Sequence, residues 1–213
     1  MWLRHSTERK PLRLILPGLA LVMGGCASTG PAAPERGAAN TGAPGVEIPA
    51  PAQTMYEQAV AAMAGGDFLD AELRFKEFLL QFPGYPGAHV NLAIIHVNNA
   101  DDDAARAAID AALAINPDHA PALNQQGMLL RKNGKFLEAE AAYLKAVTAS
   151  PDYGLAHYNL GVLNELYLQR LDVALQHFEQ YYAIVGDDKQ VEKWISDLTR
   201  RVAANQRTAN VAE

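Results

Sequence analysis

The sequence predicts an all-α protein in which pairs of helices repeat along the chain as a solenoid. The prolines Pro83, Pro117 and Pro151 stand 34 residues apart, and each closes a segment with the pattern of two amphipathic helices. Helix pairs that recur with this period are typical of solenoids, in which each repeat packs on its neighbours. Alanine is frequent and aromatic residues make up 8% of the chain, which favours closely packed helices. Such an architecture favours binding over catalysis at one central site.

The charge of the chain is unevenly distributed. The 213 residues carry a formal net charge of -6, but four of the 18 basic residues and only one of the 24 acidic residues precede Cys26. The remainder is therefore strongly acidic, which argues against binding to nucleic acid, because phosphates are neutralised by Lys and Arg. The same charge disfavours contact between this part of the chain and anionic membrane surfaces. We therefore expect no nucleic-acid partner.

Residues 1–25 have the pattern of a secretory signal peptide. Basic residues occupy the first part, and an apolar run over 12–23 is followed by two glycines. The alternative is a transmembrane anchor, but the run is shorter than the roughly 20 apolar residues that a spanning helix needs. Arg13 and Pro17 interrupt it further. We predict that 1–25 are removed from the mature protein.

Cys26, the only cysteine of the chain, follows this segment directly. Residues 22–26, VMGGC, resemble the lipobox of bacterial lipoproteins, with Met23 in place of the usual leucine. The resemblance implies that Cys26 carries the lipid, palmitate included, that anchors the mature chain in a membrane. Ala27 resembles the sorting pattern of Gram-negative lipoproteins that are placed in the outer membrane, facing the periplasm, rather than in the inner membrane. The alternative is ordinary secretion with a free thiol.

Residues 26–51, which begin with this cysteine, are rich in Pro, Gly and Ala and show no apolar period. This composition predicts a flexible linker. Fully extended, it would reach roughly 80 Å. The linker would let the repeats work at a distance from the membrane.

When the repeats are aligned on their prolines, three further positions recur. Helix A of each pair carries a small residue, and helix B carries an alanine and, one turn later, a bulky residue. Small side chains let the two helices approach closely, and the bulky side chain fills the space between successive repeats. In repeat order these residues are Ala59, Ala93, Gly127 and Gly161; Ala71, Ala105, Ala139 and Ala174; and Phe75, Ile109, Tyr143 and Phe178.

This pattern resembles the tetratricopeptide repeat, a unit of helix A, a tight turn, helix B and a terminal proline. The resemblance implies a right-handed superhelical solenoid over 52–186, with repeats at about 52–85, 86–119, 120–153 and 154–188. Turns between helices A and B are expected at Gly65-Gly66-Asp67, at Asp101-Asp102-Asp103 and at Asn133-Gly134-Lys135, because Gly and Asn tolerate a positive φ and Asp favours a helix start. The fourth repeat has a one-residue insertion near Gln169-Arg170.

A last amphipathic helix is predicted over 189–205. Its apolar residues follow helical spacing, and they are Val191, Trp194, Ile195, Leu198 and Val202. An open solenoid needs its final apolar face covered, so we interpret this helix as a cap. The alternative is that Trp194 anchors a partner. Residues 206–213 are predicted to form a disordered tail.

No catalytic constellation is present in the sequence. The phosphate-binding loop pattern, GxSxG and HExxH are all absent. His89 and His96 share a helix face, but their separation of about 10 Å is too large for one metal ion. His157 occupies the same repeat position as His89, and we interpret both as packing residues. We expect no enzyme activity, no metal or other cofactor and no small-molecule substrate.

The resemblance to tetratricopeptide repeats also implies a binding site. In this family the A helices line a concave groove, and a fixed set of repeat positions is exposed in it for a protein or peptide partner. The residues at these positions include Tyr56, Asn91, Ile94, Asn98, Asn124, Gln125, Met128, Arg131, Tyr158, Asn159 and Val162. Their amides could pair with the backbone of an extended peptide, and their apolar members could pack on its side chains. The alternative is that the asparagines pack or cap locally, and the pattern leaves both open.

The chain also resembles small lipoproteins that assist assembly of type IV or Flp pili. Repeat lipoproteins of this kind also serve secretion, polysaccharide export and TonB-type systems, and the shared motifs do not separate these systems. We expect a non-enzymatic, membrane-anchored scaffold for an envelope complex. The alternatives are a self-assembling structural element and a regulatory subunit of a cell-wall or glycan enzyme.

Overall fold

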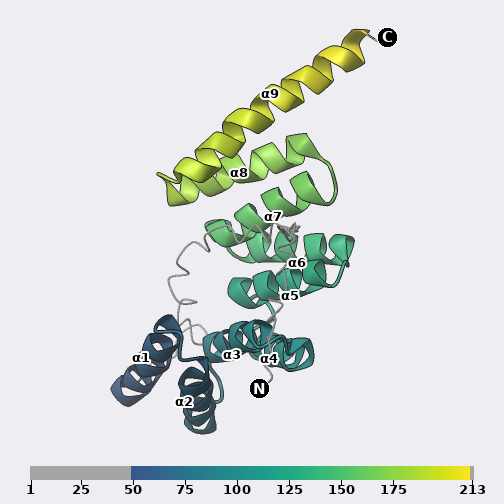
Figure 1. The fold of residues 1–213 in the computed structure, drawn as a ribbon. Helices are drawn as coiled ribbons and strands as arrows, with labels where there is room; N and C mark the ends of the chain where they lie inside the picture. The colour runs from purple at the N-terminus through teal and green to yellow at the C-terminus, as the bar shows by residue number, and fades with distance from the viewer. Residues whose placement is uncertain (1–48, 212–213) are drawn as a thin grey trace, which may run out of the picture. The chain divides into compact units, whose positions relative to one another are not determined.

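The computed structural model describes residues 49–211, and the side chains of 49–207. The predicted signal peptide, Cys26 and all but the end of the predicted linker lie outside the described residues. Helices make up the described part, joined by short turns (Figure 1). Their bounds are α1 Ala50–Ala64, α2 Phe68–Gln81, α3 Pro86–Asn98, α4 Asp102–Ile115, α5 Ala120–Lys132, α6 Phe136–Ala149, α7 Gly154–Leu166, α8 Leu171–Val185 and α9 Lys189–Val211.

Consecutive helices pack as antiparallel pairs, and the pairs follow one another along the chain (Figure 1). The pairs are α1 with α2, α3 with α4, α5 with α6, and α7 with α8, and α9 packs on α8. The first helices of neighbouring pairs also touch, because α3 contacts α5 and α5 contacts α7. The predicted all-α solenoid of helix pairs is confirmed.

The recurring small and bulky residues meet as the repeat pattern requires. A Cβ atom added to Gly127 would lie 2.5 Å from Cε1 of Tyr143, and one added to Gly161 would lie 2.7 Å from Cε1 of Phe178. Real Cβ atoms do not approach a ring this closely, so only glycine fits at these two positions. The aromatic rings themselves are completely buried. Helix A therefore rests directly on the aromatic residue of helix B.

The turns between helices A and B differ from the prediction in one detail. Asp101 was expected to help form the turn, but its φ is -96° and its side chain instead caps α4 by accepting a hydrogen bond from Ala104 N (2.9 Å). The left-handed residue of this turn is Ala100, with φ 58°, where the first and third repeats use Gly66 and Gly134. Asp67 caps α2 in the same way as Asp101 caps α4. Ala100, which has the positive φ, therefore directly precedes Asp101, whose carboxylate caps α4.

The last helix covers the end of the solenoid, as predicted, but it is longer than expected. Val191 and Leu198 are buried against the fourth repeat, and Trp194 stacks near Phe178, with ring centroids 5.5 Å apart. The predicted disordered tail over 206–213 is wrong for 206–211, because α9 continues to Val211. No glycine or proline interrupts this stretch, so nothing in the local sequence ends the helix.

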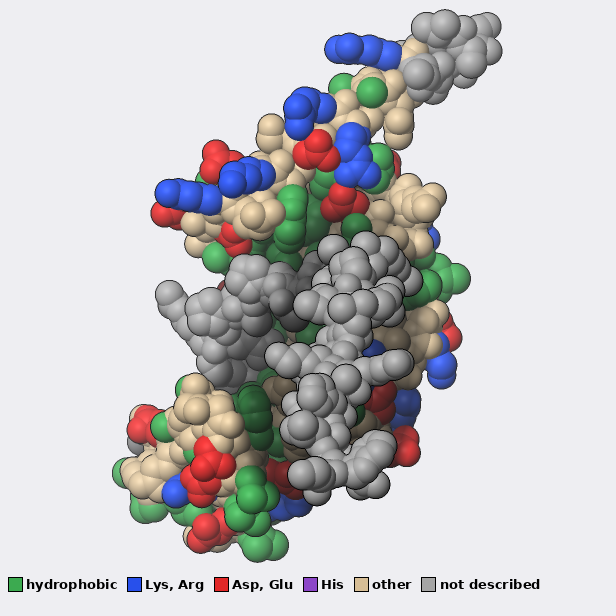
Figure 2. All heavy atoms as spheres, viewed as in Figure 1, with side chains coloured by type: hydrophobic (Ala, Val, Ile, Leu, Met, Phe, Trp, Pro, Cys, Tyr) green, Lys and Arg blue, Asp and Glu red, His purple; other side chains and the backbone are tan. Residues whose placement is uncertain are grey.

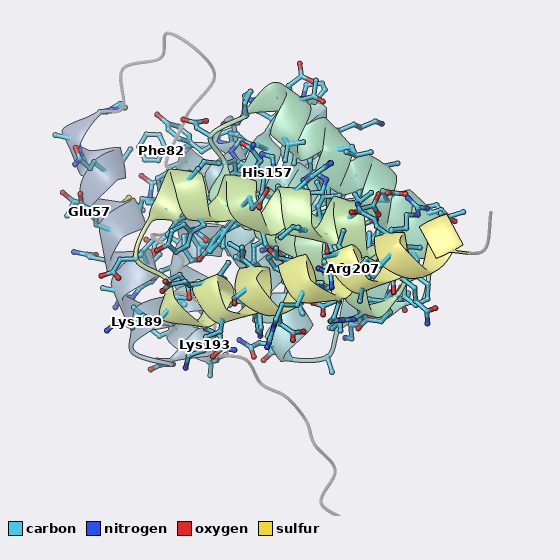
Figure 3. The ribbon with its side chains drawn as sticks, turned by 90° about the horizontal axis from the view of Figure 1, so that it is seen from above. Glu57, Phe82, His157, Lys189, Lys193 and Arg207 are labelled. Carbon is cyan, nitrogen blue, oxygen red and sulfur yellow. The ribbon has the colours of Figure 1, made fainter. Side chains whose placement is uncertain are left out.

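The outward side of α9 is polar. Lys and Arg side chains gather along it in Figure 2, and Lys189, Lys193 and Arg207 are labelled on the same helix in Figure 3. A helix that another repeat covered would present an apolar side there, so the polar side marks α9 as the end of the solenoid. None of the helices within 49–211 has the length and apolar character that a bilayer-spanning helix requires.

Candidate partner-binding face

The residues predicted to bind a partner lie on the four A helices. Because α3 contacts α5 and α5 contacts α7, the residues of these three helices form one continuous strip. We call it the A-helix face. It comprises Tyr56 of α1; Asn91, Ile94 and Asn98 of α3; Asn124, Gln125, Met128 and Arg131 of α5; and Tyr158, Asn159 and Val162 of α7.

Three asparagines of this face, Asn91, Asn124 and Asn159, bond to one another or to tyrosine across neighbouring repeats. Asn91 Nδ2 donates to Tyr56 Oη of the preceding A helix (2.8 Å), and Asn159 Nδ2 donates to Asn124 Oδ1 (2.9 Å). The donor and acceptor are 35 residues apart in both bonds, so the repeat itself brings them together. These amides join repeats and fix the position of one A helix on the next.

The expectation that all these amides are exposed to a partner is therefore wrong. Asn91, Asn124, Gln125 and Asn159 are buried, with Asn124 fully so. The physical reason is the close approach of adjacent A helices, which places each amide within reach of the neighbouring helix rather than of solvent. Of the two interpretations that the sequence left open, the structure favours local packing for the asparagines that hold these bonds.

A second set of predicted residues remains accessible. Ile94, Met128 and Val162 occupy the same position in three successive A helices, and each is only partly buried. Asn98, at the end of α3, is exposed. The accessible part of the face is thus an apolar row with one side chain per repeat, rather than a row of free amides.

Arg131 adds a charge to this face. Its Nη1 atom is buried and has no hydrogen-bond partner among the described residues, and the same is true of Tyr143 Oη. Burial raises the pKa of Tyr143 to about 12, against the opposing influence of the positive charge of Arg131. Arg131 as a whole is only partly buried, so its guanidinium is a candidate partner for a carboxylate, because charge-assisted pairs are the strongest hydrogen bonds. The sequence pointed to Arg131 but not to the phenol beside it.

Tyr158, also on the A-helix face, lies within an aromatic cluster. Its ring centroid lies 5.3 Å from that of Tyr181 and 6.0 Å from that of Trp194. Burial, and then the negative charge of Asp188, raises the pKa of Tyr158. The sequence left open whether Trp194 belongs to a cap or anchors a partner. In the structure Trp194 packs on Tyr158 as part of the capping helix. Its helical spacing with Val191 and Leu198 was the signal for that role.

The described residues offer little for catalysis. Among residues 49–211, no group of three or more His, Cys, Asp or Glu side chains is placed to hold a metal ion. The titratable residues that burial shifts most are tyrosines and histidines distributed over several repeats.

Comparison with known proteins agrees with the repeat architecture. Two family models described as tetratricopeptide repeat match residues 62–125 and 124–189, which together make up more than half of the chain. A search of curated proteins returned no match.

Several solved structures have the same fold. PilF of Pseudomonas aeruginosa is 21% identical, with a TM-score of 0.64, over 72% of this chain and 69% of that chain. MamA of Desulfovibrio magneticus RS-1 is 18% identical, with a TM-score of 0.57, over 77% and 92% of the two chains. The first repeat domain of Spaghetti (RPAP3), solved with the HSP90 peptide SRMEEVD, is 15% identical, with a TM-score of 0.51, over 55% and 95%. At these identities the likeness establishes the fold alone.

Proposed function

Because the chain belongs to the tetratricopeptide-repeat family, whose members are generally non-catalytic scaffolds for protein–protein interaction, we propose that it binds an extended segment of a partner protein on its A-helix face. The observation that carries this proposal is the accessible row formed by Ile94, Met128 and Val162, with the partly buried Arg131 one turn after Met128 on α5. Neighbouring packed helices are about 10 Å apart, which equals about three residues of extended chain. A peptide with apolar side chains at that spacing and a carboxylate near Arg131 fits the row.

A neighbour with the same fold supports this mode of binding. The Spaghetti repeat domain was solved with the seven-residue peptide SRMEEVD, so the fold accepts a short peptide that contains acidic residues. In the present chain the asparagines hold the repeats in register, and the apolar row with Arg131 would supply the contacts. Specificity would follow from the spacing of the row rather than from free amides.

The location of the scaffold is the second part of the proposal. The lipobox-like VMGGC sequence at 22–26 supports lipidation of Cys26, and Ala27 supports placement in the outer membrane, facing the periplasm. The linker of 26–51 would give the repeats reach. On the sequence resemblance, the partner belongs to an envelope complex such as a pilus, a secretion, a polysaccharide-export or a TonB-type system.

The experiment for partner binding is a crosslinked pull-down from native envelopes with the full-length protein. Met128→Gln keeps the volume of the side chain but removes its apolar end, and we expect it to weaken capture of the partner by about fivefold to tenfold. Leu137→Gln is the matched control, since Leu137 is 63% exposed on α6, outside the face. Equal capture by Met128→Gln, Leu137→Gln and the wild type would contradict the proposed face.

One observation supports self-assembly as a second candidate. Leu69, Leu73 and Leu80 lie on one side of α2, and they are 71%, 59% and 86% exposed. Apolar side chains in such a row favour association with another protein surface, including a second copy of the chain. Light scattering tests this, because a mass that rises with concentration in the wild type and not in Leu80→Glu would support self-association through α2.

A further inference from the structure

Two histidines face each other across the last helix pair. His157 of α7, labelled in Figure 3, and His177 of α8 have their Nδ1 atoms 3.2 Å apart, with ring centroids 5.4 Å apart and ring planes at 43°. Both side chains are partly exposed, so solvent and small ions can reach the pair. The proposed scaffold role uses neither residue.

The contact itself shows how the two rings share a proton. Nδ1 of His157 faces Nδ1 of His177, so one of the two atoms carries the proton and the other directs its lone pair at the neighbouring ring. In a neutral histidine the nitrogen without a proton is the atom that binds a metal ion.

We propose that His157 and His177 form a two-histidine site for a borderline divalent transition-metal ion. Cu²⁺ and Zn²⁺ are the ions that it should bind best. Two imidazole nitrogens that hold one ion at about 2.0–2.1 Å in tetrahedral geometry lie roughly 3.3 Å apart, close to the distance found here. The two rings need only turn about their last side-chain torsion, which is soft, for both lone pairs to meet at one ion. The backbones of α7 and α8 can stay in place.

The protonation state of the pair suits this role. Burial lowers the pKa of His157, and burial together with the charge of His157 lowers the pKa of His177 to about 4. Both rings are therefore neutral at pH 7, and protons do not compete with the metal ion there. Binding moves the one proton between the two Nδ1 atoms to Nε2 of the ring that carries it, through solvent, and releases no net proton. Two donors leave the other coordination positions to water, since the described residues place no third donor there.

The repeat itself provides matched controls. His89 of α3 holds the position in the second repeat that His157 holds in the fourth, and the residue there that corresponds to His177 is Ala108. The second repeat therefore presents one imidazole and a methyl group at the same place. Removing His89 should leave metal binding unchanged, and adding a histidine at Ala108 should create a second site.

The test uses the full-length protein, purified without a polyhistidine tag. It is titrated with CuCl₂ or ZnCl₂ in a calorimeter, and its Tm is measured with and without each metal ion. We expect one bound ion per chain and a rise in Tm of about 5 °C at saturation, with no rise for Mg²⁺ or Ca²⁺, which prefer oxygen ligands. His157→Gln and His177→Gln should each weaken binding about tenfold or more, while His89→Gln should match the wild type.

Each outcome decides the proposal, provided that circular dichroism shows the variants to be folded. No ion bound to the wild type, or equal affinity in His157→Gln and His177→Gln, would overturn it. A second equivalent of metal bound by Ala108→His would support it through the geometry of the repeat alone. Loss of binding in His89→Gln would move the site to another part of the chain and so would also overturn it.

Discussion

Gly127 of α5 and Gly161 of α7 determine how closely the third and fourth pairs of helices can pack. At Gly127 the neighbouring ring belongs to Tyr143, whose side chain is completely buried and cannot move aside without displacing the next repeat. An alanine would gain about 1 kcal/mol of helix propensity, but overpacking of a buried ring costs about 1–3 kcal/mol. The overpacking cost is the larger of the two, because a Cβ atom would lie 2.5 Å from the ring.

We therefore expect Gly127→Ala to lower the free energy of unfolding by up to about 2 kcal/mol, measured by urea denaturation. The control is Gly84→Ala, because a Cβ atom at Gly84 meets no atom within 4 Å and its φ is not positive. That variant should stay within about 0.5 kcal/mol of the wild type. A Gly127→Ala protein as stable as Gly84→Ala would show that the tyrosine ring has room to move.

His119 makes stability depend on pH. Its Nδ1 atom accepts a hydrogen bond from Ala122 N (3.3 Å) at the start of α5, and burial lowers its pKa from 6.5 to about 4. Between these values the unfolded chain binds a proton that the folded chain does not. The contribution to stability is therefore complete above about pH 6.5 and is lost as the pH falls toward about 4.

From pH 7 to pH 5 we expect this residue to remove about 1–2 kcal/mol from the free energy of unfolding, measured by urea denaturation at both pH values. The pKa values of His89, His157 and His177 are lowered too, so the wild-type loss includes all four histidines. His119→Asn keeps a side chain that can cap the helix and removes the titration. Its loss between the two pH values should be smaller than that of the wild type, and parallel losses would contradict the assignment.

At the scale of helices, α9 stabilises the repeat next to it. Leu198 is completely buried against the fourth repeat, and Arg201 Nη1 bonds to Glu165 Oε1 of α7 (2.6 Å). The ion pair is exposed to solvent and contributes little, whereas removal of a buried leucine side chain costs about 2–5 kcal/mol. In a solenoid each repeat is stabilised mainly by its neighbours, so the effect should be local.

Leu198→Ala should therefore accelerate hydrogen exchange in α7 and α8 while leaving α1 and α2 near their wild-type rates. Mass spectrometry of exchanged peptides separates these helices. Gln206→Ala, at an exposed position of the same helix, is the control and should change neither region. Uniform acceleration over all the repeats would mean that the solenoid unfolds as one cooperative unit.

The helices show which features the sequence can predict. The pairs were predictable because small and bulky residues recur every 34 residues, and a recurrence of this length is typical of stacked helix pairs. The positive φ of Ala100 was not, since the residue preference pointed to its neighbour Asp101. The pairing of Asn159 with Asn124 was also hidden, because it depends on the distance between two A helices and not on either helix alone. The His157–His177 contact was hidden for the same reason, since the two residues belong to different helices.

At the scale of the molecule, two proposed properties occupy separate parts of the chain. The anchor is assigned to Cys26, and the contacts with the partner are assigned to the A-helix face, in which Met128 is central. The predicted linker over 26–51 separates them in sequence, so neither should depend on the other. A single variant in each part can therefore remove one property and preserve the other.

Cys26→Ser tests this separation, with the full-length chain expressed in a Gram-negative host. We expect the wild type to incorporate radiolabelled palmitate and to sediment with the membrane, and the variant to do neither, because several acyl chains are needed for a stable anchor. Detergent-solubilised envelopes should still yield the same partner on both baits, whereas Met128→Gln should remain labelled and membrane-bound but capture less partner. A Cys26→Ser protein that still sediments would assign the anchor to another residue. A Cys26→Ser protein that loses the partner even in detergent would show that the lipidated end contributes to the binding site.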